Sequence, residues 1–288
     1  MARAYRLVGR ASEAEGALAA ALWEAGCSGV LIDGDDLVAV FADDEAEVPQ
    51  GGSWEEVDET DHVAAYFEGL DAVLAGSVVV APTHRSVTLS AGQRVVWLDP
   101  GMAFGTGHHE STRLALAALA DPARDLRGKH VLDVGTGSGL LAIVADLLGA
   151  AQSVGLDVDP VSVEVARANA ELNRSRARFE LADFALAPLP ETATAGSADL
   201  LVANLFAELH DVLMDTYAEV LRPGGRAILS GILDGREALV RRAVRSPLKL
   251  VHAEREGEWW MLEVERERDD EREGDRERGL DREREGQG

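Results

Sequence analysis

Three glycines in close succession form the most informative stretch of the chain. Gly135, Gly137 and Gly139 follow a short apolar run, and an apolar helix is expected to begin at Leu140. A strand that leads through a glycine turn into a helix is typical of nucleotide-binding α/β units. The register here is G-x-G-x-G, whereas a dinucleotide-binding loop needs G-x-G-x-x-G. Asp133, two residues before the first glycine, would also repel a pyrophosphate. This stretch therefore predicts a nucleoside site without phosphates.

Two polar residues stand where later strands are expected to end. Ligands of open α/β sheets bind at the carboxyl ends of the strands. Asp157 follows Gly135 by 22 residues, and its carboxylate can accept both hydroxyls of a ribose. The amide oxygen of Asn204 can hold a reacting amine, and the ring of Phe206 can attract a cationic group. Each polar residue has a plainer interpretation as a cap of the following turn or helix. Together with the glycine turn, we favour a ligand site.

A second glycine-containing stretch, residues 101–113 (G-M-A-F-G-T-G-H-H-E-S-T-R), leads into another predicted helix. A loop of this kind can close over a ligand, and Thr112 is expected in the first turn of the helix. His108 and His109 raise the question of a metal ion. Neighbouring residues rarely point at one ion, and the usual i, i+4 helical spacing is absent. We therefore expect no metal site.

The elements that must position these residues alternate between strands and helices. This pattern predicts an α/β fold with a doubly wound, mostly parallel seven-stranded sheet. Helices are expected at 160–173 and 207–221, and a turn at 222–225 ends the second of them. Only a short turn separates the last two strands, which indicates an antiparallel edge. The expected strands are 130–134, 153–157, 178–182, 199–204, 227–231, 248–254 and 259–264.

The first part of the chain predicts a separate small α+β domain. It comprises a strand at 5–8, a helix at 12–25, and strands at 30–33 and 37–41 that form a hairpin. A polar linker over 43–59 and a connecting helix over 61–74 follow, and an Arg/Glu/Asp run without an apolar face ends the chain. We divide the chain into an α+β domain (1–45), linker and connecting helix (46–75), main domain (76–264) and disordered tail (265–288).

Charge narrows the choice of partners. The 288-residue chain has a net charge of −24, which argues against a nucleic-acid partner because phosphate binding needs clustered Lys and Arg. Residues 1–68 contain 16 acidic and 3 basic side chains. This concentration at the front favours a basic partner there, although high negative charge can also serve solubility alone.

The remaining composition points to a cytoplasmic protein. The single cysteine, Cys27, has no partner for an internal disulfide and is expected in the core. No apolar run reaches transmembrane length, and the first residues lack the features of a signal peptide. We expect no association with membranes and a monomeric chain.

Several motifs resemble those of a known family. The stretch 131–139 (V-L-D-V-G-T-G-S-G), together with Asp157, resembles motifs of class I methyltransferases that use S-adenosylmethionine. More specifically, residues 101–113, the run 204–210 (N-L-F-A-E-L-H) and the glycine-containing segment 224–233 resemble the family that methylates ribosomal protein L11. The resemblance extends over about residues 1–265. It implies that the front domain recognises L11 and swings on the linker, while the main domain methylates lysine side-chain and N-terminal amines.

The resemblance also implies a set of site residues. Asn204 would orient the acceptor amine, and His108 or His109 is a candidate for removing its proton. Phe104, Gly105 and Thr106 would line the methionine end of the cofactor. The predicted cofactor-binding residues are completed by Thr112, Asp133, Gly135, Gly137, Asp157 and Asn204.

Other functions remain as alternatives to methylation of L11. A class I methyltransferase acting on another protein, a small molecule or an amide-type nitrogen would keep the same cofactor. Enzymes of the amide-type group usually carry Asn-Pro-Pro-aromatic, whereas Leu205 and Phe206 follow Asn204 here. A nucleoside-binding module without catalysis and a dehydrogenase are further alternatives, and the G-x-G-x-G register argues against the dehydrogenase.

Overall fold

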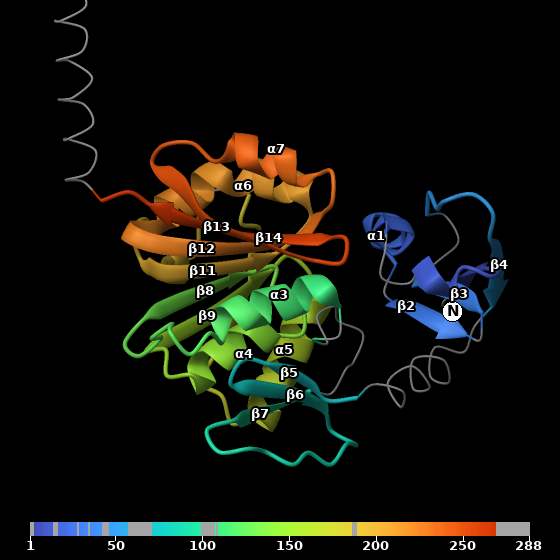
Figure 1. Cartoon of the computed structure of the whole chain (residues 1–288), viewed down its shortest axis with the longest axis horizontal. Helices are drawn as coiled ribbons and strands as arrows, with labels where there is room; N and C mark the ends of the chain where they lie inside the picture. The colour runs from blue at the N-terminus through green and yellow to red at the C-terminus, as the bar shows by residue number, and fades with distance from the viewer. Residues whose placement is uncertain are drawn as a thin grey trace, which may run out of the picture.

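The computed structural model describes residues 3–13, 17–27, 29–33, 35–41, 46–56, 71–98, 107, 109–185 and 189–268. These residues form a small antiparallel sheet near the N-terminus, followed by an α/β domain built on a seven-stranded and a three-stranded sheet (Figure 1). None of the helices in the described part of the chain is long and apolar enough to span a membrane.

The N-terminal sheet has four strands in the order β2-β3-β1-β4, and all its neighbours pair antiparallel. Its elements are β1 (Arg3–Leu7), a 3-10 turn (Ala11–Glu13), α1 (Ala17–Glu24), β2 (Gly29–Asp33), β3 (Asp36–Phe41) and β4 (Ser53–Glu56). The predicted strand-helix-hairpin order is confirmed. Apolar side chains of β1, α1 and β3 form its core together with Cys27, which is buried as expected.

Strand β4 corrects the prediction of a polar linker over 43–59. The ring of Trp54 lies 5.0 Å from that of Tyr5 and 5.1 Å from that of Phe41. The Tyr5 hydroxyl donates to the carbonyl of Pro49 at 2.6 Å and accepts from the backbone N–H of Gly52 at 2.9 Å. These contacts hold a short strand that is too polar to show a strand pattern by itself. The N-terminal unit therefore extends at least to Glu56.

A three-stranded sheet precedes the main sheet and was not predicted. It comprises β5 (Val73–Ala75), β6 (Val78–Pro82) and β7 (Arg94–Leu98), with an antiparallel and a parallel pair. Strand β5 overlaps the end of the helix predicted over 61–74, so the prediction is wrong there, whereas residues 57–70 lie outside the described residues. Every residue of β6 is buried, and Val78 and Val80 join the core of the α/β domain.

The main sheet confirms the predicted fold class. Its seven strands lie in the order β10-β9-β8-β11-β12-β14-β13. Neighbours from β10 to β12 pair parallel, and β14 runs antiparallel to both β12 and β13, as expected for the edge. The strands are β8 (His130–Val134), β9 (Gln152–Asp157), β10 (Arg178–Leu181), β11 (Ala198–Asn204), β12 (Leu221–Leu233), β13 (Leu248–Glu256) and β14 (Trp259–Arg266).

Helices cover both faces of this sheet. Figure 1 shows α3, α4 and α5 on one face and α6 and α7 on the other. Each face has its own apolar core, and the fully buried Tyr217 is the largest side chain in the core under α6. The helices are α3 (Glu110–Leu119), α4 (Leu140–Leu147), α5 (Pro160–Leu172), α6 (Ala207–Val220) and α7 (Glu237–Ala243), with a 3-10 turn at Glu191–Ala193.

The turn predicted at 222–225 is a bulge within β12. Leu221 pairs with Ala198, and the next partners along the two strands are Arg226 and Leu200. A side chain at Gly225 would place its Cβ 2.8 Å from the carbonyl oxygen of Arg222. Glycine at position 225 therefore lets residues 222–225 form a bulge. Strand β12 begins directly after α6 and continues on both sides of this bulge.

Candidate functional site

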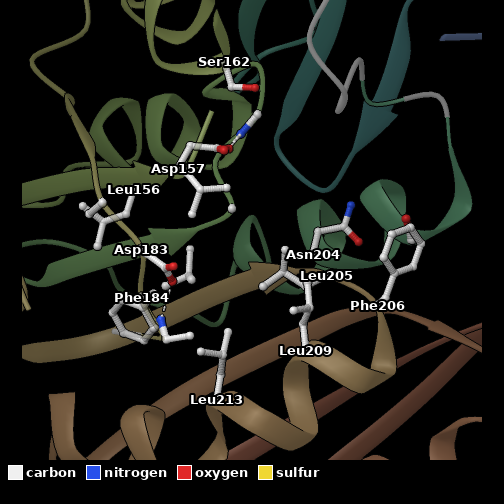
Figure 2. Close-up of a pocket in the computed structure, with 18 of the residues that line it drawn as sticks. Leu156, Asp157, Ser162, Asp183, Phe184, Asn204, Leu205, Phe206, Leu209 and Leu213 are labelled. Atoms are coloured by element: carbon white, nitrogen blue, oxygen red, sulfur yellow. Dashed lines mark hydrogen bonds between the residues drawn. The ribbon is translucent and has the colours of Figure 1, made fainter. Parts of the chain in front are cut away.

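A pocket of about 350 Å³ opens at the carboxyl ends of the parallel strands. Strand β8 has β9 on one side and β11 on the other, so the strand order reverses at this point, where open α/β sheets bind ligands. Figure 2 shows Asp157, Asp183 and Phe184 toward one end of the pocket and Asn204 and Phe206 toward the other. The pocket thus has carboxylates at one end and an amide with an aromatic ring at the other.

The glycine turn requires its glycines for two different reasons. Gly135, Gly137 and Gly139 have φ values of +71°, +51° and +82°, a region that side chains disfavour. At Gly139 a Cβ would also lie 2.8 Å from the Cβ of Ala166, so this glycine lets α4 start close to α5. In a dinucleotide-binding loop, the third glycine of G-x-G-x-x-G allows this close helix packing. Here Gly139 has that role, one residue earlier in the register.

The Asp157 side chain binds the glycine turn and also lines the pocket. Its Oδ2 accepts a hydrogen bond from the backbone N–H of Gly137 at 2.9 Å, and its Oδ1 accepts one from Asp159 at 3.0 Å. The side chain is half-buried and lines the pocket. A half-buried carboxylate already held by backbone donors is a preorganised acceptor for hydroxyl groups.

Asp133 lies beside the glycine turn but does not line the pocket. Its Oδ2 accepts from the Thr136 hydroxyl at 2.6 Å and from the backbone N–H of Ala142 at 3.1 Å, so it ties the turn to the start of α4. Its Oδ1 is buried without a hydrogen-bond partner in the described part of the chain. Burial raises the pKa of Asp133 to about 7, although both hydrogen bonds oppose that rise. The geometry supports a structural role more directly than the predicted cofactor contact.

The raised pKa of Asp133 predicts a pH-dependent stability. Because the folded state binds a proton more tightly than the unfolded chain, the stabilising contribution of protonated Asp133 is lost as pH rises from about 4 toward 7. We expect the free energy of unfolding to fall by about 3 kcal/mol between pH 5 and pH 8 relative to Asp133→Asn. Urea unfolding of both proteins across this range measures the difference. Parallel pH profiles would contradict the assignment.

Asn204 and Thr112 meet although 92 residues separate them. The Nδ2 of Asn204 donates to the Thr112 hydroxyl at 3.1 Å, which orients the amide. Its Oδ1 is buried and has no partner among the described residues. Gly231 makes this arrangement possible, because a Cβ there would lie 2.9 Å from that oxygen. Asn204 lines the pocket, and Thr112 stands behind it. This oxygen is therefore a hydrogen-bond acceptor that no described group of the chain satisfies.

His109 is half-buried at the N-terminus of α3, where its Nδ1 accepts from the backbone N–H and hydroxyl of Ser111 at 3.3 and 2.8 Å. Its ring packs edge-on against Trp259, with the centroids 4.5 Å apart. Burial lowers the pKa of His109 to about 4, so the ring is neutral at pH 7. Such a weakly basic ring is poorly suited to the predicted removal of a proton from an amine. We therefore assign it a capping role.

The other predicted site residues are only partly described. Phe104, Gly105, Thr106 and His108 lie outside the described residues, and their roles stay predictions. No group of three metal-ligating side chains occurs in the part of the chain that the structure describes.

Two further pocket residues were missed from the sequence. Asp183 is exposed, and its Oδ1 accepts from the backbone N–H of Ala185 at 2.9 Å. Phe184 is buried against Tyr217, and both Asp183 and Phe184 line the pocket just beyond β10. A polar residue after the predicted end of this strand is the same signal that identified Asp157 and Asn204.

Comparison with known proteins identifies the family. The family model for ribosomal protein L11 methyltransferase (PrmA) matches residues 42–267. The chain belongs to this family. It is 45% identical to the ribosomal protein L11 methyltransferase of Thermus thermophilus over 90% of this chain and 97% of that protein. It is 47% identical to the one of Deinococcus radiodurans over 77% and 82%. A solved structure of the ribosomal protein L11 methylase of Lactobacillus delbrueckii subsp. bulgaricus matches with a TM-score of 0.61 and 29% identity, covering 69% of this chain and all of that one.

Membership confirms the expected methyltransferase activity and the expected cofactor, S-adenosylmethionine. The pocket residues fit this molecule. The glycine turn brings no basic side chain into the pocket, as suits a nucleoside without phosphates, and Asp157 offers a hydroxyl acceptor. The carboxylate end of the pocket therefore suits the nucleoside part of this cofactor.

Proposed function

We propose that this chain transfers methyl groups to lysine side-chain and N-terminal amines of ribosomal protein L11. The observation that carries the proposal is the buried Oδ1 of Asn204, which has no hydrogen-bond partner among the described residues and lies at the end of the pocket opposite Asp157. The names of the relatives support L11 as the substrate. The excess of acidic residues in the first 68 positions suits a basic partner such as an RNA-binding protein.

The cofactor would be held by groups along the whole pocket. Asp157 would accept the two ribose hydroxyls, and Asp183 would accept from an amino group of the base beside the Phe184 ring. S-adenosylmethionine, when bound, supplies a methyl group attached to a positively charged sulfur. The sulfur becomes a neutral thioether once the methyl group is transferred. The ring of Phe206 lies at the same end as Asn204 and can stabilise that charge.

The acceptor amine must lose a proton before it reacts. A lysine of pKa about 10.4 costs roughly 4.6 kcal/mol to deprotonate at pH 7. The pocket residues Trp259 and His109 would reduce this cost. Because both are uncharged, they disfavour an ammonium ion and would lower the pKa of a lysine bound near Asn204. The Asn204 oxygen would accept one N–H of the neutral amine and point its lone pair along the pocket. Positioning then supplies most of the acceleration, and no general base is assigned.

Transfer of label tests the proposal directly. Purified chain is incubated with S-adenosylmethionine labelled in the methyl group and with L11, free or within the large ribosomal subunit. We expect label in L11, located by mass spectrometry on lysine side chains and the N-terminal amine. The Asn204→Ala variant provides the control for contaminating activity. Label found only in other proteins would favour the alternative of a methyltransferase with another protein substrate.

Two finer expectations accompany this proposal. We expect the chain to be cytoplasmic, where it would meet a ribosomal protein, and to act as a monomer. Fractionation of cells and sedimentation of the purified chain test these two predictions separately.

A further inference from the structure

A buried polar cluster lies beneath the turn that carries Asn204. His210, in the first turns of α6, is fully buried. Its Nε2 lies 2.8 Å from the carbonyl oxygen of Ser230 on β12, and its Nδ1 lies 3.2 Å from the Tyr217 hydroxyl. His210 does not line the pocket, so it does not touch a ligand there. The mechanism described above makes no use of it.

The partners of His210 decide where its proton lies. A carbonyl oxygen only accepts hydrogen bonds, so Nε2 must carry the proton and donate to Ser230. Nδ1 is then an acceptor, and the Tyr217 hydroxyl donates to it. Burial lowers the pKa of His210 to about 4, although the carbonyls of Ser230 and Leu205 oppose the change. The ring is therefore neutral at pH 7, with one defined tautomer.

The same carbonyl connects the cluster to the reacting end of the pocket. The Ser230 oxygen also accepts the backbone N–H of Leu205 at 3.0 Å. The Ser230 hydroxyl donates to the carbonyl of Ser111 at 2.7 Å, which fixes β12 to α3. Helix α3 carries Thr112, the partner of the Asn204 amide. The turn after β11 is thus held from α6, β12 and α3 at once.

We propose that His210 is a positioning residue for methyl transfer, which holds the Asn204-Leu205-Phe206 turn through the Ser230 carbonyl. This inference rests on the proposed function for its kinetic effect, because Asn204 is assigned there to the acceptor amine. The nucleoside end depends on other residues, namely the glycine turn, Asp157 and Asp183. Loss of the His210 contact should therefore displace the acceptor end and change the Kd for the uncharged S-adenosylhomocysteine little.

Two variants of similar size separate the two hydrogen bonds of the ring. In His210→Gln the side-chain N–H₂ reaches the position of Nε2 and keeps the bond to Ser230, whereas the shorter His210→Asn reaches only the position of Nδ1. We expect His210→Asn to lower kcat by about 100-fold, the effect of a displacement of about 1 Å. The Kd for S-adenosylhomocysteine should stay within about threefold of the original chain, and His210→Gln should recover most of the kcat.

Tyr217→Phe is a milder variant that removes only the hydroxyl and retains the packed ring. We expect it to lower kcat by about fivefold without changing the Kd for S-adenosylhomocysteine. If His210→Asn does not fold, the kcat of Tyr217→Phe tests the positioning role in its place. A kcat equal to that of the original chain in the folded variants, or a parallel loss of kcat and cofactor affinity, would overturn the proposal.

Two further measurements do not depend on the substrate. Nitrogen chemical shifts of the His210 ring should show the Nε2–H tautomer at pH 7, and the Leu205 amide should exchange with solvent faster in His210→Asn than in His210→Gln. The opposite tautomer or equal exchange would overturn the role of His210. If these readouts agree with the proposal but L11 is not methylated, the proposed function has failed and the positioning role has not.

Discussion

Replacing Asn204 with alanine should lower kcat for methyl transfer by about 100- to 1,000-fold, the usual loss when one preorganised polar group at a reacting centre is removed. The amide oxygen is buried and accepts no hydrogen bond from the part of the chain that the structure describes, and the amide is oriented by Thr112. Alanine removes the only acceptor we assign to the reacting amine. The Kd for S-adenosylhomocysteine and the melting temperature should change little, and steady-state kinetics with calorimetry measure the split.

Two further variants control this experiment. Thr112→Val keeps the acceptor oxygen but frees the amide to rotate, so we expect a smaller loss of kcat, about tenfold. Glu208→Gln alters an exposed side chain only four residues beyond Asn204, and its kcat should match that of the unmodified chain. Unchanged turnover in Asn204→Ala would contradict the role of the amide in orienting the acceptor.

The second large effect is expected at the opposite end of the pocket. Asp157→Ala removes the proposed ribose acceptor and also the oxygen that binds the Gly137 N–H at 2.9 Å. Hydrogen bonds to a charged group contribute about 1.5–3 kcal/mol each. We therefore expect the Kd for S-adenosylhomocysteine to rise by about 100-fold, since about 2.7 kcal/mol corresponds to that factor. Isothermal titration calorimetry measures the change.

Asp159 provides a matched control for Asp157. Its carboxylate caps α5 by accepting the backbone N–H groups of Val161 and Ser162 at 2.9 and 3.3 Å, and it does not line the pocket. Asp159→Ala should cost about 1 kcal/mol of stability, as expected for a lost helix cap, and leave the Kd within about twofold. Equal weakening of cofactor binding by both variants would show that Asp157 acts only through the local fold.

The main sheet was predictable because its signals are local. Each of its strands is a short apolar run bounded by Gly, Pro or polar residues, and the following helix has its own periodicity. The candidates Asp157 and Asn204 were found because each ends such a run. Asp183 has the same position after β10 and was overlooked, although the signal was present.

Elements that depend on distant partners escaped prediction. Strand β4 is short and mostly polar, and Trp54 is held by rings from β1 and β3. The apolar run of β6 is a strand signal, but its place beside β7 depends on a parallel pairing across intervening residues. The β12 bulge looks like a turn because Pro223, Gly224 and Gly225 are turn residues, and only pairing with β11 returns the chain to the sheet.

The sequence alone determined the strand-glycine-helix unit, the succession of strands and the polar residues that end them, because backbone propensity and hydrophobic period act over a few residues. Only the tertiary structure decided what these side chains do. Asp133 and Asp157 are both carboxylates beside the glycine turn, yet one is buried beneath it and the other lines the pocket. The neutral state of His109 and the buried position of His210 likewise depend on Trp259, Tyr217 and Ser230. The burial and hydrogen-bond partners of these side chains come from segments distant in the chain, and they set the protonation of Asp133, His109 and His210.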